Sequence, residues 1–447
     1  MTGRLDGARA VPTTEDGEII RLSKHAWPLA LIGAWLIASP ASAQLGRLGG
    51  EIRGLPSTLG GTVSGTLGEL RQGVDQTVSD LSSTASEVSH DRLHDLVRDH
   101  PKALDLDDNG AAVVRGEVLA ISPSPVSLDI IARAGFSVIR ESRLDSLGLD
   151  LVTLGAPKGM PARAALRRLR ALDPSGRYDL DHLYASAGGS AGAVALEVGG
   201  DQAGSAGERI GLLDTGIDRK HPAFAAANIE TRGFAPGGVV PAAHGTAVAS
   251  LIVGQAHGFH GSAPAAGLLA ADVYGSGPTG GSAEAIAQGL AWMAENHIRV
   301  INVSLVGPPN LTLEAAVRAL TGHGVLIVAP VGNDGPAAPP LYPAAYPGVI
   351  AVTGVDRRGK ALIEAGRAGH IDFAAPGADL QAAKPGGGFT RVRGTSFAAP
   401  IVAGRLSAML AGDNSRSAAR AVAALTDQAR QAGGVVGRDL AVADQAR

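Results

Sequence analysis

Between residues 208 and 410, short apolar segments alternate with longer segments of helical periodicity, and this alternation limits the fold more than any other feature. Strands that alternate with helices form a parallel sheet whose two faces are both covered. The sequence therefore predicts an α/β fold with a mostly parallel sheet, helices on both faces and a functional site at the carboxyl ends of the strands. The expected strands are Ile210–Leu213, Leu268–Val273, Val300–Leu305, Val325–Val331 and Val349–Val355, and the expected helices are His244–Gly254, Ser282–His297, Leu313–Gly322 and Ser396–Leu410.

Residues 113–187 show shorter elements in the order strand, helix, strand, strand, helix, strand, which predicts a small α+β sandwich of the ferredoxin-like type. Ser124 is expected to cap the first helix, with Pro125 in its first turn. Residues 188–207 are rich in Gly, Ala and Ser and form a linker that is open to cleavage. The expected strands are Gly116–Ile121, Ser137–Arg140, Leu149–Leu154 and Tyr178–Tyr184, and the helices are Ser124–Ala134 and Ala162–Leu172.

Residues 1–43 are predicted to be a signal peptide. Lys24 precedes an apolar run from Ala26 to Ala38, and Ala41-Ser42-Ala43 is the small-residue pattern after which signal peptidases cut. The run is short for a membrane span. The long stretch of mixed charge before it leaves two alternatives, a start further downstream or a short uncleaved anchor. We expect a secreted or periplasmic protein that meets the membrane only during export.

Two further segments flank the predicted domains. Residues 44–112 are expected to be a low-complexity linker or loose helix, and residues 413–447 a helical tail with its helix at Ser417–Ala432. His90 and His94 are spaced like a zinc-protease motif with Asp91 in place of Glu. A solvated helix face is favoured, because Asp is too short to reach a metal-bound water and a third ligand is not evident.

Composition excludes several classes of function. The chain has no cysteine, so disulfides, thiolate metal sites and a cysteine nucleophile are all absent. Its formal net charge of -3 gives no basic face, and we expect no nucleic-acid partner.

An acidic residue, Asp214, ends the apolar segment Ile210–Leu213 and is followed by Thr215-Gly216. A carboxylate in this position can lie behind an imidazole, fix its tautomer and stabilise its charged form. The alternative is a strand-end Asp that caps a turn.

His244 and Ser396 each stand at the start of a predicted helix. Histidine is the usual general base, and Gly245 is expected to leave room for a substrate beside it. The helix that begins near Ser396 presents free N–H groups to a developing oxyanion, and Pro400 is expected in its first turn. Taken singly, a structural His and an N-cap Ser are the alternatives.

Asn333 lies in the segment Val331–Pro336, directly after a predicted strand. Its amide can donate a hydrogen bond to a tetrahedral oxyanion, beside the backbone N–H of Ser396. A Gly-flanked turn is the alternative reading of this Asn.

The four segments that contain Asp214, His244, Asn333 and Ser396 together resemble the subtilisin-like serine proteases, and the resemblance covers residues 208–412. The resemblance implies that Asp214 orients His244, that His244 is the base for Ser396, and that Asn333 is the oxyanion donor. It implies a secreted serine endopeptidase that hydrolyses protein or peptide substrates through an acyl-enzyme. It also implies that residues 113–187 are a propeptide that assists folding and inhibits the enzyme, with its Tyr184–Ala187 tail in the active-site cleft.

The segment Val300–Leu305 resembles the family strand that pairs with the substrate backbone, so four residues are expected to bind substrate: Ser304, Leu305, Val306 and Gly307. Val306 stands where the family usually has Gly and is expected to narrow the primary pocket. No cofactor is expected for catalysis. Structural calcium is common in the family, but it is not indicated here because the candidate acids are scattered: Asp218, Asp272, Asp356 and Asp372.

Two other classes remain open. Asp214-Thr215-Gly216 is the signature of aspartic proteases, whose chemistry needs two such carboxylates, and the chain has one copy. A binding module on an inactive protease fold is the other class, although all four candidate catalytic residues are present.

Overall fold

The computed structural model describes residues 92–186, 189–191, 208–411 and 417–431. The predicted signal peptide, His90 and most of the expected linker at 44–112 lie outside these ranges. Within the described residues, no helix is both long and apolar enough to cross a membrane.

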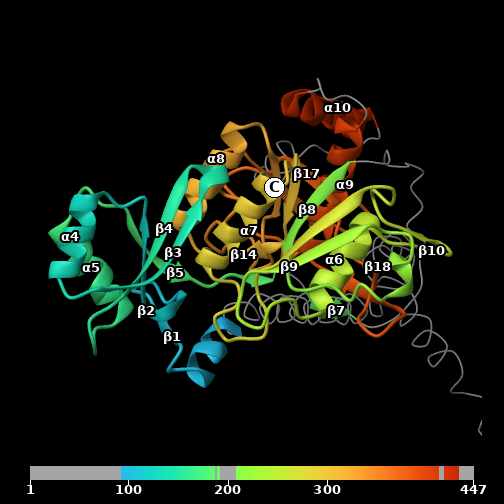
Figure 1. Ribbon diagram of the computed structural model, residues 1–447. Coiled ribbons are helices and arrows are strands. Elements are labelled where there is room, and N and C mark those ends of the chain that lie inside the picture. Colours follow the sequence, from blue (N-terminus) through green and yellow to red (C-terminus); the bar gives the residue numbers. More distant parts are fainter. Residues whose placement is uncertain (1–91, 187–188, 192–207, 412–416, 432–447) are drawn as a thin grey trace, which may run out of the picture. The chain divides into compact units, whose positions relative to one another are not determined.

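A seven-stranded parallel sheet forms the centre of the C-terminal half, as the sequence predicts (Figure 1). Five of its strands were expected, and two edge strands were not. β9 (Ile229–Gly233) buries only one side chain and β17 (Phe373–Pro376) has four residues, so neither carries a strong apolar pattern. The strand order is β17, β16 (Val349–Val355), β15 (Leu326–Pro330), β13 (Val300–Val303), β8 (Arg209–Asp214), β12 (Gly267–Asp272), β9.

Helices cover both faces of this sheet. Successive residues of β8 point to opposite faces: Leu213 packs in one cluster with α7 (Ala283–Glu295) and α8 (Leu311–Gly322), whereas Leu212 packs with α6 (Ala243–Val253). α9 (Thr395–Leu410) shares the second face, and α10 (Ala418–Gln431) packs on α9 through Ala421 and Leu425. Both layers therefore hold the carboxyl ends of the strands in place.

The N-terminal unit has the ferredoxin-like topology, with antiparallel strands in the order β5, β2, β4, β3. Ser124 caps its first helix by accepting a hydrogen bond from Ser127 N–H, as predicted. The elements are β2 (Ala112–Ile121), α4 (Pro125–Arg133), β3 (Ser137–Leu144), β4 (Leu149–Gly155), α5 (Ala162–Leu172) and β5 (Tyr178–His182).

Ordered structure begins earlier than the expected boundary at 113. Residues 92–99 are helical, and β1 (Leu104–Leu106) pairs with the start of β2. Leu93 and Leu96 pack against a small cluster that contains Leu104 and Leu183. Because these contacts join residues 92–106 to the sheet, we count residues 92–186 as one N-terminal unit.

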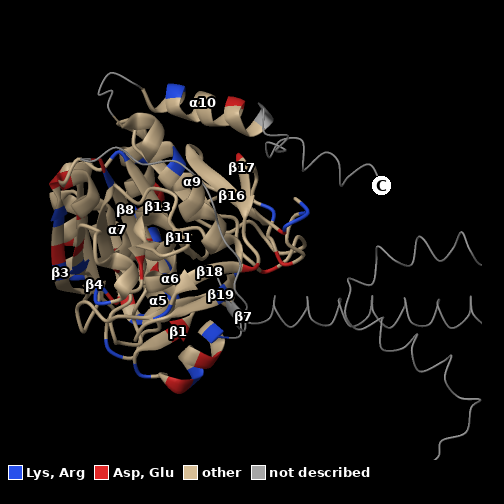
Figure 2. Ribbon diagram, turned by 90° about the vertical axis from the view of Figure 1, so that its right-hand side faces the viewer, with Lys and Arg blue, Asp and Glu red and all other residues tan. Residues whose placement is uncertain are grey.

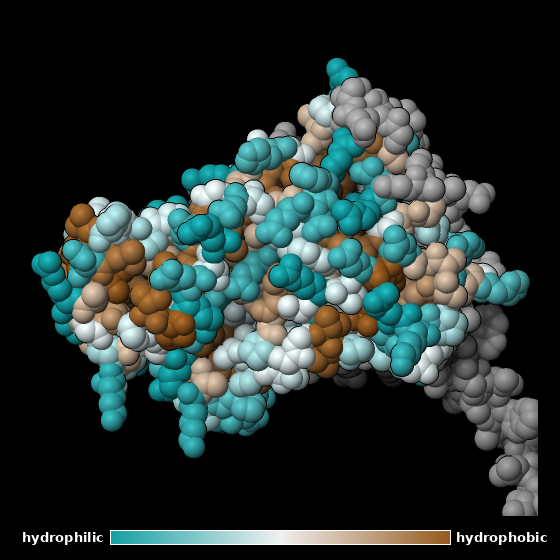
Figure 3. Space-filling model, viewed as in Figure 1, coloured by the Kyte–Doolittle hydropathy of each residue, from teal (hydrophilic) through white to brown (hydrophobic). Residues whose placement is uncertain are grey.

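The sheet of the N-terminal unit packs against the C-terminal half, residues 208–411. The helices α4 and α5 pack on one face of this sheet. The other face carries Leu119 and Leu151, which lie in the same apolar cluster as Leu290 of α7. Five of the seven large apolar side chains that are exposed among the described residues belong to this unit. Figure 3 shows brown, hydrophobic patches on its surface at the left of the view. Burial of Leu119 and Leu151 against the C-terminal half stabilises a unit that is too small for a large core of its own.

Basic and acidic residues are interspersed on the face shown in Figure 2, and neither sign forms a continuous patch there.

Candidate active site

Three of the predicted residues meet at the carboxyl edge of the parallel sheet. Asp214 is the last residue of β8, His244 the second residue of α6, and Ser396 the second residue of α9. Strands β8 and β13 lie side by side in this edge, and the two helices start above it. The alternation of strands and helices therefore gathers residues that are far apart in the sequence.

His244 bridges the other two side chains. Its Nδ1 lies 2.8 and 2.9 Å from the two carboxylate oxygens of Asp214, and its Nε2 lies 3.0 Å from Ser396 Oγ. Asp214 and Ser396 are fully buried, and the His244 side chain is 10% exposed. An ionised carboxylate only accepts hydrogen bonds, so Nδ1 carries the proton and Nε2 is left to accept the proton of Ser396.

Gly245 has a packing role that the sequence did not indicate. A Cβ at this position would lie 2.1 Å from the carbonyl oxygen of Thr215, and Gly245 N–H donates to Thr215 Oγ1 at 2.8 Å. The glycine therefore allows the start of α6 to approach the end of β8, next to His244 and Asp214. The expectation that it also leaves room for substrate stays a prediction.

Asn333 lies in the loop after β15, beside the start of α9. Its Oδ1 accepts a hydrogen bond from Thr395 N–H at 2.9 Å. This bond ties Asn333 to the residue that precedes Ser396. The expected bond from its amide nitrogen to an oxyanion stays a prediction.

Pro400 was placed incorrectly by the sequence pattern, whereas the expected contact of Ser304 with substrate stays a prediction. Pro400 is the sixth residue of α9, inside the helix, and so removes the N–H that would bond to the carbonyl of Ser396. Ser304 Oγ donates to that carbonyl at 3.2 Å, while Asn302 Nδ2 donates to Ser304 Oγ at 2.6 Å. The side chain of Ser304 thus contacts the backbone of Ser396.

The strand expected to pair with substrate is already paired with another segment of the same chain. Leu305 and Val306 form β14, which pairs antiparallel with β6 (Ala185–Ser186). Gly307 instead exchanges two backbone hydrogen bonds with Tyr342, each 3.0 Å long. An antiparallel strand on this edge has the geometry of a bound peptide backbone.

Sequence reasoning missed two parts of this arrangement. Tyr184 is fully buried, and its hydroxyl donates to the carbonyl of Pro308 at 2.8 Å. β7 (Gly189–Ala191) pairs with β19 (Phe389–Arg393), which ends just before Gly394 and the start of α9. Neither β7 nor β19 has an apolar pattern that stands out in the sequence.

The four candidate calcium ligands are each occupied by backbone N–H groups. Asp218, Asp272, Asp356 and Asp372 accept bonds from Lys220, Val240, Arg358 and Ala351, respectively. Hydrogen bonds of this kind are typical of carboxylates that fix turns and loops. These four residues are not brought together as a set of ligands in the described part of the chain.

A buried Asp, His and Ser in hydrogen-bond contact, on a parallel α/β sheet, define a serine hydrolase of the Asp-His-Ser type. The model of the subtilase family matches residues 205–441. Subtilisin Savinase from Lederbergia lenta is 39% identical over 209 residues, which are 44% of this chain and 74% of the relative. An alkaline protease from Shouchella clausii is also 39% identical, over 44% of this chain and 52% of the relative, and subtilisin E from Bacillus subtilis is 34% identical, over 45% and 55%.

Among solved structures, fervidolysin from Fervidobacterium pennivorans, a keratinolytic enzyme related to subtilisin, matches with a TM-score of 0.60. The match covers 70% of this chain and 57% of that structure, at 20% identity, and so it shows the fold. The chain spans about half the length of the alkaline protease and of subtilisin E.

The chain belongs to the subtilase family. It is a subtilisin-like serine endopeptidase, a hydrolase of peptide bonds.

Proposed function

We propose that Ser396 attacks the peptide bond, with His244 as its base, Asp214 as the residue that orients His244, and Asn333 as a donor to the oxyanion. The observation that carries this proposal is the position of the His244 ring, whose two nitrogens contact the Asp214 carboxylate at 2.8 Å and Ser396 Oγ at 3.0 Å.

The chemistry follows from these contacts. His244 Nε2 takes the proton of Ser396 Oγ as this oxygen bonds to the scissile carbonyl carbon. The carbonyl oxygen becomes an oxyanion and accepts bonds from Asn333 and the backbone N–H of Ser396. His244 then gives its proton to the leaving amine, which leaves an acyl-enzyme, and water attacks the acyl group by the same steps.

The test of these roles is peptide hydrolysis by the wild type and its variants, with each variant chain first processed in trans by added wild-type enzyme that is then removed. Ser396→Ala and His244→Ala should each lower kcat by about 10⁶, a magnitude taken from a subtilisin. Asp214→Asn removes the charge behind His244 and should cost about 10⁴. Activity retained by correctly folded Ser396→Ala would overturn the proposal.

We propose that the N-terminal unit is an inhibitory propeptide, which its pairing with two strands near the candidate site supports. β6 pairs with β14, which follows Ser304, and β7 pairs with β19, which ends close to Ser396 in the sequence. We expect self-cleavage between Ser186 and Gly189, since these residues flank the active site on both sides. N-terminal sequencing of the wild type beside Ser396→Ala tests this, and equal processing of the two chains would contradict it.

Export is proposed from residues 1–43 alone. Expression with and without these residues, followed by fractionation, should place only the complete chain outside the cytoplasm. We further propose that protein or peptide chains are the substrates and that catalysis needs no cofactor.

The two competing classes are less well supported. Asp214 is fully buried, and both of its carboxylate oxygens contact His244 Nδ1, whereas an aspartic protease needs two carboxylates that share a proton. An inactive binding module would have no reason to keep Ser396 Oγ in contact with His244 Nε2. Pepstatin should therefore leave activity unchanged, whereas serine reagents should abolish it.

A further inference from the structure

The last strand of the N-terminal unit presents two aspartates to the catalytic half. Asp179 Oδ2 accepts a bond from Leu311 N–H at the start of α8, at 2.7 Å. Asp181 Oδ1 accepts a bond from Glu284 N–H at the start of α7, at 3.0 Å. Both carboxylates complete a helix N-terminus, which favours negative charge. β5 thus contacts both helices on which the unit is docked.

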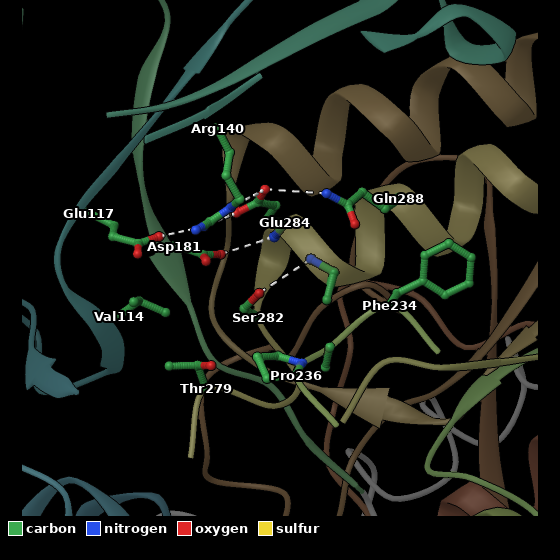
Figure 4. A pocket seen from close by; sticks show the side chains of 12 residues that line it. Val114, Glu117, Arg140, Asp181, Phe234, Pro236, Thr279, Ser282, Glu284 and Gln288 are labelled. Carbon is green, nitrogen blue, oxygen red and sulfur yellow. Dashed lines mark hydrogen bonds and ion pairs between the residues drawn. The ribbon is translucent and has the colours of Figure 1, made fainter. Parts of the chain in front are cut away.

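Around Asp181 lie two further carboxylates and one guanidinium (Figure 4). Oxygens of Glu117, Asp181 and Glu284 all lie within 4.8 Å of one another. Arg140 Nη2 contacts Glu284 at 2.6 Å and Glu117 at 2.8 Å. We call these four residues the carboxylate cluster. It joins β2, β3 and β5 of the N-terminal unit to α7 of the catalytic half.

Negative charge exceeds positive charge in this cluster. Arg140 supplies one positive charge against three carboxylates, two of which, Asp181 and Glu284, are buried. Gln288 and Ser282, which line the same site, are neutral. Uncompensated charge in a buried site is costly, and a carboxylate there is neutralised by taking up a proton.

The other charged groups along β5 have partners of their own. Asp179 lies 3.8 Å from Arg170 of α5. His182 Nε2 lies 3.3 Å from Asp107, and its Nδ1 contacts the amide of Asn310, which caps α8. Neither Arg170 nor His182 therefore supplies a compensating charge to the carboxylate cluster.

We propose that the carboxylate cluster is a proton-dependent latch, which holds the N-terminal unit on the catalytic half in acid and weakens as the pH rises. The proposal rests on the inhibitory role given to this unit above and adds the condition under which inhibition ends. Release exposes Asp181 to water, where it loses its proton, so a low proton concentration favours release.

The direction follows from the proton balance. Burial, reinforced by the charge of Glu284, raises the pKa of Asp181 from 3.8 to about 8, and burial also raises the pKa of Glu117. A carboxyl with a higher pKa in the docked state binds a proton on docking. Docking is therefore strongest below the ordinary pKa near 4 and loses up to about tenfold in its equilibrium constant per pH unit until about pH 8.

Amide hydrogen exchange in the complete Ser396→Ala chain tests the latch without needing activity. In this chain, the protection of the Glu284 amide, corrected for the intrinsic exchange rate, should fall at least about tenfold between pH 6 and pH 8. In a second chain that also carries Asp181→Asn, which keeps the acceptor oxygen but has no titrating proton, protection should fall much less, by no more than the share that Glu117 contributes. Amides of β8 should stay protected in both chains.

The matched control is Asp179→Asn, the same change two residues away on the same strand. It should lower protection by a similar factor at every pH and leave the pH dependence intact. Flat protection with Asp181 present, or the same fall in the Asp181→Asn chain, would overturn the latch. Should Asp181→Asn unfold β8, Glu117→Gln replaces it: losing this neighbouring charge must move the transition to lower pH, and an unmoved transition overturns the latch.

Discussion

Ser304 Oγ donates a hydrogen bond of 3.2 Å to the backbone carbonyl of Ser396, at the position where Pro400 removes the donor that a regular helix would supply. The carbonyl belongs to the proposed nucleophile and is buried with it. The hydroxyl of Ser304, which lies between β13 and β14, thus replaces a helix hydrogen bond and fixes the first turn of α9.

Ser304→Ala should leave this carbonyl without its partner, at a cost of about 1–3 kcal/mol. We expect kcat to fall about tenfold with little change in KM, because the turn that carries Ser396 loosens while the substrate strand is unchanged. Pro400→Ala restores an N–H to the helix, so Ser304→Ala should cost less in that background. Equal costs in both backgrounds would show that Ser304 acts elsewhere.

Asn333 has two functions that substitution can separate. Asn333→Ala removes both the donor to the oxyanion and the acceptor of Thr395 N–H, and should lower kcat by about 10²–10³. Asn333→Asp keeps the acceptor and loses the donor, so thermal stability should stay close to that of the wild type while kcat falls at least as far. An Asp variant with wild-type kcat would remove Asn333 from the oxyanion site.

Gly307 is packed against the ring of Tyr184. A Cβ at Gly307 would lie 2.4 Å from Tyr184 Cδ1, so Gly307→Ala should displace the ring and weaken the hold on the Tyr184–Ser186 tail. Activity should therefore appear sooner after purification of the complete chain. Gly322→Ala is the control, since a Cβ there meets nothing within 4 Å, and it should keep the wild-type time course.

Removal of metal ions should not stop catalysis. The proposed chemistry uses only the side chains of Ser396, His244, Asp214 and Asn333 together with water. An excess of EDTA should leave the kcat of the processed enzyme within about twofold of its value in buffer, since no step passes through a metal ion. A large loss that added calcium reverses would show that a bound ion supports the fold.

The sequence predicts the centre of the fold well because its apolar strands are buried on both faces. Leu212 and Leu213 are both fully buried, so β8 reads as a continuous apolar segment. The edge strand β9 and the short strands β7 and β19 give no such signal, since their pairing depends on partners distant in the sequence. The position of Pro400 was misjudged because even in the expected helix from Ser396 it is the fifth residue, and the hydroxyl of Ser304 that replaces its missing N–H is distant in the sequence.

The sequence anticipated those site residues whose side-chain type suits catalysis and which also stand at the end of a strand or the start of a helix, such as Asp214 and His244. It did not anticipate the side chains that connect the two halves of the chain. In the strand Tyr178–His182, Asp179 and Asp181 alternate with apolar residues, a pattern of a solvated strand face, yet both are buried against helix N-termini. The alternation shows that the two aspartates lie on the same face of the strand. It does not show that helix N-termini cover this face, because that contact exists only in the folded chain.

The central claim is that Ser396 is the nucleophile, and the most direct measurement is mass-spectrometric mapping of a fluorophosphonate probe on the processed enzyme. We expect one modified residue, Ser396, and no labelling in Ser396→Ala or after unfolding. Labelling should also be strongly reduced in His244→Ala, because the hydroxyl then lacks its base. Modification of a different serine, or an active enzyme that never labels at Ser396, would show that Ser396 is not the nucleophile.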